Sequence, residues 1–148
     1  MKKYRIKNGE LVTKAGILPR DLLLSDGKIE AIIDRGVKTE DYAELSADGL
    51  YVSPGFVDIH QHGGGGADYM DCEDDTYFLA TEAHLRHGTT SVLPTTLSAT
   101  GEAMLKAVKS YLSAKKDPRI RANLLGLHME GRYISPAQAG AQKPVVMQ

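Results

Sequence analysis

Residues 51–71 read YVSPGFVDIHQHGGGGADYMD, in which a chain-breaking pair, a strand-like run and four glycines follow one another. Pro54-Gly55 ends the preceding segment, and the pattern of 56–62 predicts a strand. Side chains alternate between the two faces of a strand, so His60 and His62 share one face. Two imidazoles at this spacing can bind one metal ion, because neutral imidazole is a common ligand of zinc and other divalent ions.

The glycine run at 63–66 has more than one interpretation. A flexible loop is the simplest, and a lone pair of alternate histidines also arises by chance in many proteins. Glycines at a strand end also allow backbone and ligand to approach closely. A nucleotide phosphate loop is disfavoured, because no GK[ST] motif follows and no helix begins directly after the glycines.

Composition is typical of a globular protein. The chain has 148 residues, 42% of them hydrophobic and 25% charged, with a formal net charge of −1. We therefore expect one domain, or one small domain and part of another. No basic stripe indicates a nucleic-acid partner, and no apolar run is long enough to indicate a membrane partner. Cys72 is the single cysteine and no signal-peptide pattern opens the chain, so we expect a cytoplasmic protein without disulfides.

Residues 1–53 predict short strands joined by tight turns. Asn-Gly and Asp-Gly pairs between strand-like runs are the strongest short hairpin signals. About fifty residues of hairpins make a thin core, which usually requires a partner. The two expected hairpins are Tyr4–Lys7 with Glu10–Thr13 around Asn8-Gly9, and Asp21–Ser25 with Lys28–Ile33 around Asp26-Gly27.

After Pro54 the pattern predicts strands alternating with helices, which is typical of βαβ units and a parallel sheet. Such strands are too few to close an eight-stranded barrel, which needs roughly 250 residues, so we expect an N-terminal fragment of a larger protein. The expected strands are 56–62, 89–96 and 124–130. The expected helices run from Asp74 or Asp75 to about His87, with Phe78, Leu79, Ala83 and Leu85 buried, and from Ser98 or Thr100 to about Lys116, with Met104, Leu105, Val108, Tyr111 and Leu112 buried.

His128 and Glu130 repeat the spacing of the first pair at the end of the third strand. Ligands bind at the carboxyl ends of parallel strands, so His60, His62 and Glu130 can converge on one point. Two imidazoles and a carboxylate form an established zinc site that leaves a coordination position for water. Such a site can catalyse the hydrolysis of an amide or an ester. Alternatively, Glu130 bridges two ions, or it only caps a loop or pairs with Arg132.

Four further side chains, two of them candidate partners of the ligands, have separate interpretations. We expect His128 and Asp58 to orient the metal ligands through hydrogen bonds rather than to bind the ion. His84 and His87 fall near the end of the first helix, where the helix dipole favours surface histidines.

Three ordered motifs resemble a known family. PGFVDIHQH at 54–62 resembles the PGFxDxHxH signature of the amidohydrolase superfamily. Within that superfamily, HGGGGAD at 62–68, GTTSVLPT at 88–95 and GLHMEG at 126–131 resemble the N-acetylglucosamine-6-phosphate deacetylases. The resemblance extends over the whole chain and is weak before Ala47.

The resemblance implies an α/β fold: the first part of a metal-dependent (β/α)8 TIM barrel, preceded by the N-terminal part of a small β-sandwich domain. Residues 1–53 would supply the sandwich strands, and 54–148 the first three βα units of the barrel. It implies hydrolysis of the N-acetyl group of an amino-sugar phosphate in the cytoplasm, and a homodimer.

The resemblance also implies roles for individual residues. Glu130 is then a metal ligand, and His60 and His62 hold a further ion in members that have it. The cofactor is a divalent metal, either zinc, iron or manganese, as one ion or two. Ala141 and Gln142 contact the sugar, and the catalytic aspartate lies beyond the end of this chain.

The sequence departs from the family pattern after Gly131, where Arg132 replaces the usual proline. Arginine does not fix the backbone as proline does, so the loop that carries Ala141 can differ, or the cation can lie near an anionic substrate. Two alternative functions stay open. One is another amidohydrolase activity, dihydroorotase-like or deaminase-like, and the other is a non-enzymatic module that binds a metal or a small molecule.

Overall fold

A computed structural model describes residues 2–131 and 133–142, and the interpretations of Arg132 lie outside these residues. The chain divides into two compact units, Met1–Pro54 and Gly55–Gln148. Neither α1 (Thr76–Leu85) nor α2 (Gly101–Ala114), the α-helices of the described residues, combines the length and the apolar character needed to cross a bilayer.

The first unit consists of two sheets. A four-stranded sheet has the order β5-β4-β1-β6, and a three-stranded sheet has the order β3-β2-β7. The strands are β1 (Lys3–Lys7), β2 (Glu10–Thr13), β3 (Gly16–Leu18), β4 (Arg20–Ser25), β5 (Lys28–Asp34), β6 (Ala43–Ser46) and β7 (Tyr51–Val52).

One of the two expected hairpins is confirmed and the other is wrong. β4 and β5 pair antiparallel across Asp26 and Gly27, whose φ angles of 48° and 77° are those that a tight hairpin turn needs. β1 pairs with β4 and β6, whereas β2 pairs with β3 and β7, so the strands beside Asn8-Gly9 enter different sheets. Gly9 is required for close packing instead, because a Cβ there would lie 2.6 Å from Cγ2 of Val52.

A buried ion pair supplements the small apolar core of this unit. The Arg5 guanidinium donates to Oδ2 of Asp21 through Nε at 2.9 Å and Nη2 at 2.6 Å. Its Nη1 donates to the Val37 carbonyl at 2.6 Å and to Oγ1 of Thr39 at 3.0 Å. The hydrogen bonds of Arg5 therefore link the polar connection after β5 to the sheet.

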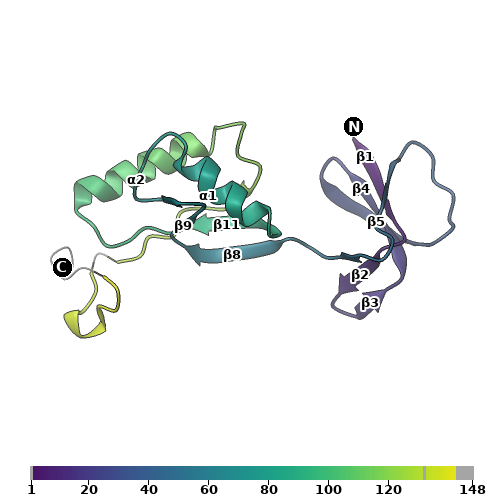
Figure 1. The fold of residues 1–148 in the computed structure, drawn as a ribbon, viewed down its shortest axis with the longest axis horizontal. Coiled ribbons are helices and arrows are strands. Elements are labelled where there is room, and N and C mark those ends of the chain that lie inside the picture. Colours follow the sequence, from purple (N-terminus) through teal and green to yellow (C-terminus); the bar gives the residue numbers. More distant parts are fainter. Residues whose placement is uncertain (1, 132, 143–148) are drawn as a thin grey trace. The chain divides into compact units, whose positions relative to one another are not determined.

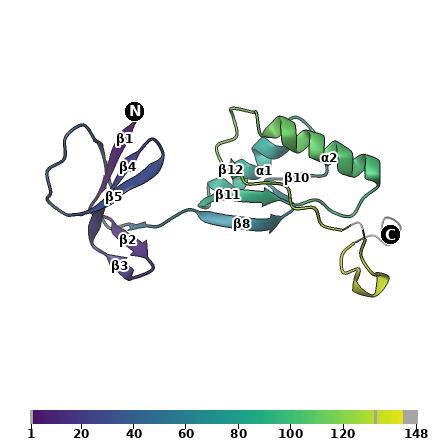
Figure 2. The ribbon, with the colours of Figure 1, turned by 180° about the vertical axis from the view of Figure 1, so that it is seen from behind.

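The second unit contains a parallel sheet with the order β12-β11-β8, as the sequence predicts. Figures 1 and 2 show helices α1 and α2 on the same side of this sheet. The elements of the second unit are β8 (Phe56–Gln61), β9 (Gly63–Gly64), β10 (Ala67–Asp68), α1 (Thr76–Leu85), β11 (Thr89–Pro94), α2 (Gly101–Ala114), β12 (Asn123–Leu124) and the 3-10 turn η1 (Pro136–Gln138).

The third strand is much shorter than the expected 124–130. Only β12 is regular, and an isolated bridge between Thr95 and His128 follows it. The chain still runs beside β11, because the Leu125 N–H donates to the Val92 carbonyl at 3.0 Å and the His128 N–H to the Pro94 carbonyl at 2.8 Å. The irregular segment therefore brings Glu130 to the carboxyl end of the sheet.

The helices begin and end near the expected residues, but only one has the expected cap. Thr100 caps α2, with its side chain accepting from the Ala103 N–H at 3.3 Å. Asp75 stands at the N-cap of α1 and makes no such bond. Its carboxylate instead accepts from Nη1 of Arg119 at 2.7 Å, which ties the start of α1 to the turn before β12.

The expected helix stripes are confirmed in part, because Met104 and Tyr111 of α2 are buried, but three expected leucines are not. Leu79, Leu105 and Leu112 are exposed by 45%, 54% and 52%. Small, aliphatic and aromatic side chains fill the core. Burial is the largest influence on the Tyr69 phenol and raises its pKa to about 12, so the phenol stays protonated. The core cluster consists of Tyr69, Tyr77, Ala80, Val92, Tyr111, Ala114 and Leu124.

Candidate metal centre

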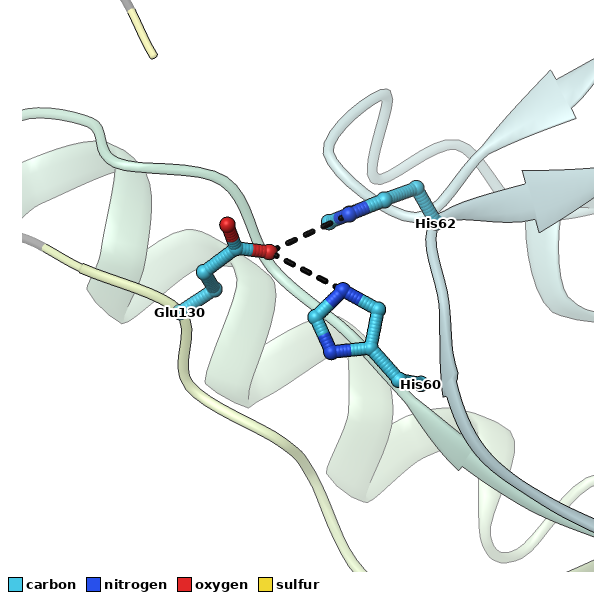
Figure 3. A group of neighbouring side chains, drawn as sticks. All are labelled: His60, His62 and Glu130. Atoms are coloured by element: carbon cyan, nitrogen blue, oxygen red, sulfur yellow. Dashed lines mark ion pairs between the residues drawn. The ribbon is translucent and has the colours of Figure 1, made fainter. Parts of the chain in front are cut away.

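Three side chains meet at the carboxyl ends of the parallel strands. His60 lies on β8, His62 follows it directly, and Glu130 follows β12. Oε2 of Glu130 lies 3.2 Å from Nε2 of His60 and 3.2 Å from Nε2 of His62. Figure 3 shows one carboxylate oxygen pointing between the two rings. The structure therefore brings together the three ligands that strand periodicity predicts.

The shared oxygen fits a metal ligand better than a hydrogen-bond acceptor. Oε2 of Glu130 is buried and has no hydrogen-bond partner among the described residues. Ligand atoms about 2.0–2.1 Å from a tetrahedral zinc ion lie about 3.3 Å from one another, which is close to the separations seen here. One ligand atom from each of the three residues lies within 4.8 Å of the other two. A divalent ion therefore fits this group.

The end of β11 orients His62. Nδ1 of His62 lies 3.2 Å from the Thr95 carbonyl oxygen, which can only accept a hydrogen bond. The ring proton therefore belongs on Nδ1, and the lone pair of Nε2 faces the shared point. Metal-binding histidines usually have such a partner on the other nitrogen.

His128 and Asp58 lie beside the ligand group and not in it. The His128 ring packs edge-on against the His60 ring, with centroids 4.8 Å apart, and its Nδ1 lies 2.9 Å from the Ile59 carbonyl oxygen. Oδ1 of Asp58 accepts from the His60 N–H at 3.1 Å. His128 thus contacts the His60 ring, whereas Asp58 contacts the His60 backbone.

The glycine run is a packed hairpin, so the flexible-loop interpretation is wrong. β9 and β10 pair antiparallel and lie against α1. A Cβ on Gly63 would lie 2.0 Å from the Ala67 carbonyl oxygen, and one on Gly64 would lie 2.7 Å from Nε2 of His84. That nitrogen lies 2.8 Å from the Gly63 carbonyl oxygen, so His84 secures the residue after His62 and is not a free surface histidine.

Glu130 is held by Thr96, which the sequence does not assign to the site, and by Gln142, which the resemblance assigns to the sugar and not to Glu130. Its N–H donates to Oγ1 of Thr96 at 3.2 Å. The Gln142 amide donates through Nε2 to Oε1 of Glu130 at 2.7 Å and accepts from the Ser98 N–H at 2.9 Å. Gln142 is buried while Ala141 is exposed, so the two expected sugar contacts have different surroundings. The only sequence feature that could have placed Thr95, Thr96 and Ser98 near the site is that they form a hydroxyl-rich segment at the end of a strand.

Residues 51–144 match the model of the amidohydrolase family. The chain belongs to this family. The match includes His60, His62 and Glu130, so the candidate metal centre lies within the amidohydrolase segment of the chain.

Several named relatives of this amidohydrolase chain are deacetylases, and another, from Geobacillus stearothermophilus, is a D-hydantoinase that is 36% identical over 72% of this chain and 22% of the relative. The chain is 34% identical to an N-acetylglucosamine-6-phosphate deacetylase of Bacillus subtilis, over 93% of its own length and 36% of the relative's. It is 35% identical to an N-acetylgalactosamine-6-phosphate deacetylase of Escherichia coli O157:H7, over 90% of its length and 34% of the relative's. The crystal structure of N-acetylglucosamine-6-phosphate deacetylase from Pasteurella multocida aligns with a TM-score of 0.88 and 28% identity, covering 99% of this chain and 38% of that one. The chain thus spans little more than a third of the length of these deacetylases.

Proposed function

We propose that the protein hydrolyses the N-acetyl group of N-acetylglucosamine 6-phosphate and releases glucosamine 6-phosphate and acetate. The observation that carries this proposal is the convergence of His60, His62 and Glu130 on one point, in a chain similar to deacetylases over 93% of its length. The assignment concerns the whole protein to which these residues belong.

The roles of the three ligands follow from their chemistry. His60 and His62 each offer a neutral imidazole nitrogen, and Glu130 offers one carboxylate oxygen. This ligand set suits zinc best, with iron or manganese as alternatives. It would bind the single ion of a one-metal site or one of the ions of a two-metal site. A divalent ion held by these residues would supply Lewis-acid chemistry, polarising an amide carbonyl and lowering the pKa of a water molecule toward neutrality. We assign no general acid or base to residues of this chain.

The segment after Glu130 is the proposed sugar contact. Ala141 is exposed, and Gln142 reaches the site through its hydrogen bond to Glu130. This proximity supports a sugar placed beside the ligand group, with Ala141 contacting it through the backbone. His128 and Asp58 are proposed to keep His60 in place.

We assign the architecture in the same way. The parallel βαβ order and the high TM-score support the first strands of a (β/α)8 barrel at 54–148. The two sheets before Pro54 support part of a β-sandwich domain at 1–53. Assembly as a homodimer and a cytoplasmic location stay predictions from the family resemblance.

The direct test measures acetate release by the full-length protein. We expect turnover of N-acetylglucosamine 6-phosphate, loss of turnover after chelation, and recovery when zinc, iron or manganese is returned. Unphosphorylated N-acetylglucosamine is the matched substrate control and should react poorly. Absence of acetate release with all three metals supplied would overturn the proposed activity.

A second candidate substrate is N-acetylgalactosamine 6-phosphate, because the Escherichia coli relative named for it is 35% identical. The two sugars differ only in configuration at C4. The ratio of kcat/KM for the two decides between them. Turnover of a cyclic amide or an amine in place of both sugars would favour another amidohydrolase activity, and metal binding without any turnover would favour a binding module.

A further inference from the structure

The side chain of Gln142 is engaged at both ends and almost fully enclosed. It is 8% exposed. Its Oε1 accepts from the Ser98 N–H at 2.9 Å, and its Nε2 donates to Oε1 of Glu130 at 2.7 Å. The Ser98 N–H requires an acceptor and the carboxylate requires a donor, so the orientation of the amide is fixed.

This contact decides which oxygen of Glu130 is free. Gln142 occupies Oε1, whereas Oε2 has no hydrogen-bond partner among the described residues and lies 3.2 Å from each imidazole nitrogen. The Glu130 N–H is also held, by Oγ1 of Thr96. A long carboxylate side chain is thus fixed at its backbone and at one oxygen, with the other oxygen directed at the two histidines.

A close backbone approach supports the same arrangement. Gly131 has a φ angle of 76°, and a Cβ there would lie 1.7 Å from Oγ of Ser98. Only glycine at this position lets the residue after Glu130 lie against Ser98, whose N–H donates to Oε1 of Gln142. The segment that carries the metal ligand and the segment that anchors Gln142 are therefore in direct contact.

We propose that Gln142 is a positioning residue for the metal ligand Glu130, and that it directs Oε2 toward His60 and His62. This inference rests on the metal site of the proposed function. It gives the Gln142 side chain a role in metal binding, in place of the direct contact with the sugar that the resemblance implies. Outer partners of metal ligands typically contribute tenfold to a hundredfold in metal affinity. A side chain that only contacts the sugar would contribute to substrate binding instead.

The test compares Gln142→Met with wild type in the full-length protein. Methionine keeps the length of the side chain and removes both hydrogen bonds. We expect zinc affinity, measured by competition with a chelator in the absence of substrate, to fall about tenfold to a hundredfold. Gln138→Met is the matched control, because Gln138 is exposed in the same loop, and its zinc affinity should equal that of wild type.

A second variant and a second readout make the result independent of simple misfolding. Gln142→Asn keeps the amide but is too short to join Ser98 and Glu130, so its zinc affinity should also fall. The visible spectrum of the cobalt-substituted protein should change in both variants, and kcat at saturating metal should fall more than KM rises. Unchanged zinc affinity with a raised KM in both variants would overturn the positioning role.

The outcomes separate this inference from the proposed function. If wild type releases acetate and Gln142→Met binds zinc as tightly as wild type, only the positioning role is wrong. If wild type binds zinc without releasing acetate, the function is wrong and the affinities still decide the role of Gln142. If wild type binds none of the three metals, both are overturned.

Discussion

Thr95 and Thr96 connect the two segments that carry the candidate ligands. The Thr95 carbonyl faces Nδ1 of His62, and Oγ1 of Thr95 accepts from the Gln61 N–H at 3.1 Å. Oγ1 of Thr96 accepts from the Glu130 N–H. Because β11 lies between β8 and β12, its last residues are within reach of both ligand-bearing segments. Their hydrogen bonds link the segment that carries the histidines to the segment that carries the carboxylate.

The grouping of the three candidate ligands could be predicted from the sequence, whereas the contacts that hold them could not. Strand periodicity places His60 and His62 on one face, and parallel topology brings Glu130 to the same edge. The contact of Gln142 with Glu130 depends on the path of the loop between them, and no local pattern encodes that path. The same applies to the His84 contact with Gly63, which forms only when the hairpin packs on α1.

Replacing His62 by alanine tests the ligand group at the scale of one residue. We expect His62→Ala to lower metal affinity at least as much as the tenfold to hundredfold that loss of an outer partner costs, because a direct ligand is removed. Metal content after dialysis, measured by elemental analysis of the full-length protein, checks this. His87→Ala is the control, since His87 is exposed. Equal metal content in His62→Ala and wild type would contradict a role for His62 as a ligand.

At the scale of elements, local turn signals predict pairing only where packing agrees with them. Asp26-Gly27 adopts the backbone of a tight turn, and β4 pairs with β5 around it. At Asn8-Gly9, the Asn8 N–H donates to the buried carboxylate of Asp21, and Gly9 packs against Val52. These long-range contacts outweigh the hairpin preference and direct β2 into a second sheet.

The expected stripe of α1 is wrong in part for a similar reason. The core contacts of α1 involve Tyr77 and Ala80, which pack near Tyr69 in the segment after β10. A count of large apolar residues at helical spacing selects Leu79 instead, although small side chains allow closer packing of a helix on a sheet. On α1 the buried face therefore combines a large aromatic residue, Tyr77, with a small one, Ala80, and apolar spacing alone does not select it.

Replacing Gly63 by alanine tests the hairpin that follows β8. Gly63 has a φ angle of 150°, and an added Cβ would lie 2.0 Å from the Ala67 carbonyl oxygen. We expect Gly63→Ala to lower the free energy of unfolding by about 1–3 kcal/mol more than Gly66→Ala, because backbone must move to admit the methyl group. Gly66 also has positive φ but faces open space, so it isolates the cost of backbone conformation. Equal losses in the two variants, measured by urea titration, would contradict this account.

At the scale of the whole molecule, the buried ion pair makes the stability of the first unit depend on pH. Burial raises the pKa of Asp21, but the Asn8 N–H and the Arg5 guanidinium lower it by more, and the net pKa is below the ordinary value of 3.8. The folded state therefore favours the ionised carboxylate. The resulting stabilisation is complete well above pH 3.8 and is lost as the pH falls through the lower pKa of the folded state.

Replacing Asp21 by alanine tests this dependence. At pH 7 we expect Asp21→Ala to lower the free energy of unfolding by about 3–5 kcal/mol, because Arg5 is left buried without its partner. The difference from wild type should shrink as the pH falls below 3.8, the ordinary pKa of the group. Asp34→Ala breaks an exposed pair with Arg20 and should cost less than about 1 kcal/mol. A difference that stays constant from pH 7 to pH 2 would contradict the assignment.

The position of β11 between β8 and β12 has a consequence for chain entropy. His62 and Glu130 are separated by about 70 residues, and closing a loop of that length costs about 4 kcal/mol. In this fold the backbone hydrogen bonds of β11 to both neighbours close the loop before any ligand arrives. A cation that binds here therefore meets ligand atoms that are already close together. Its binding free energy is then not reduced by the entropy of closing the loop.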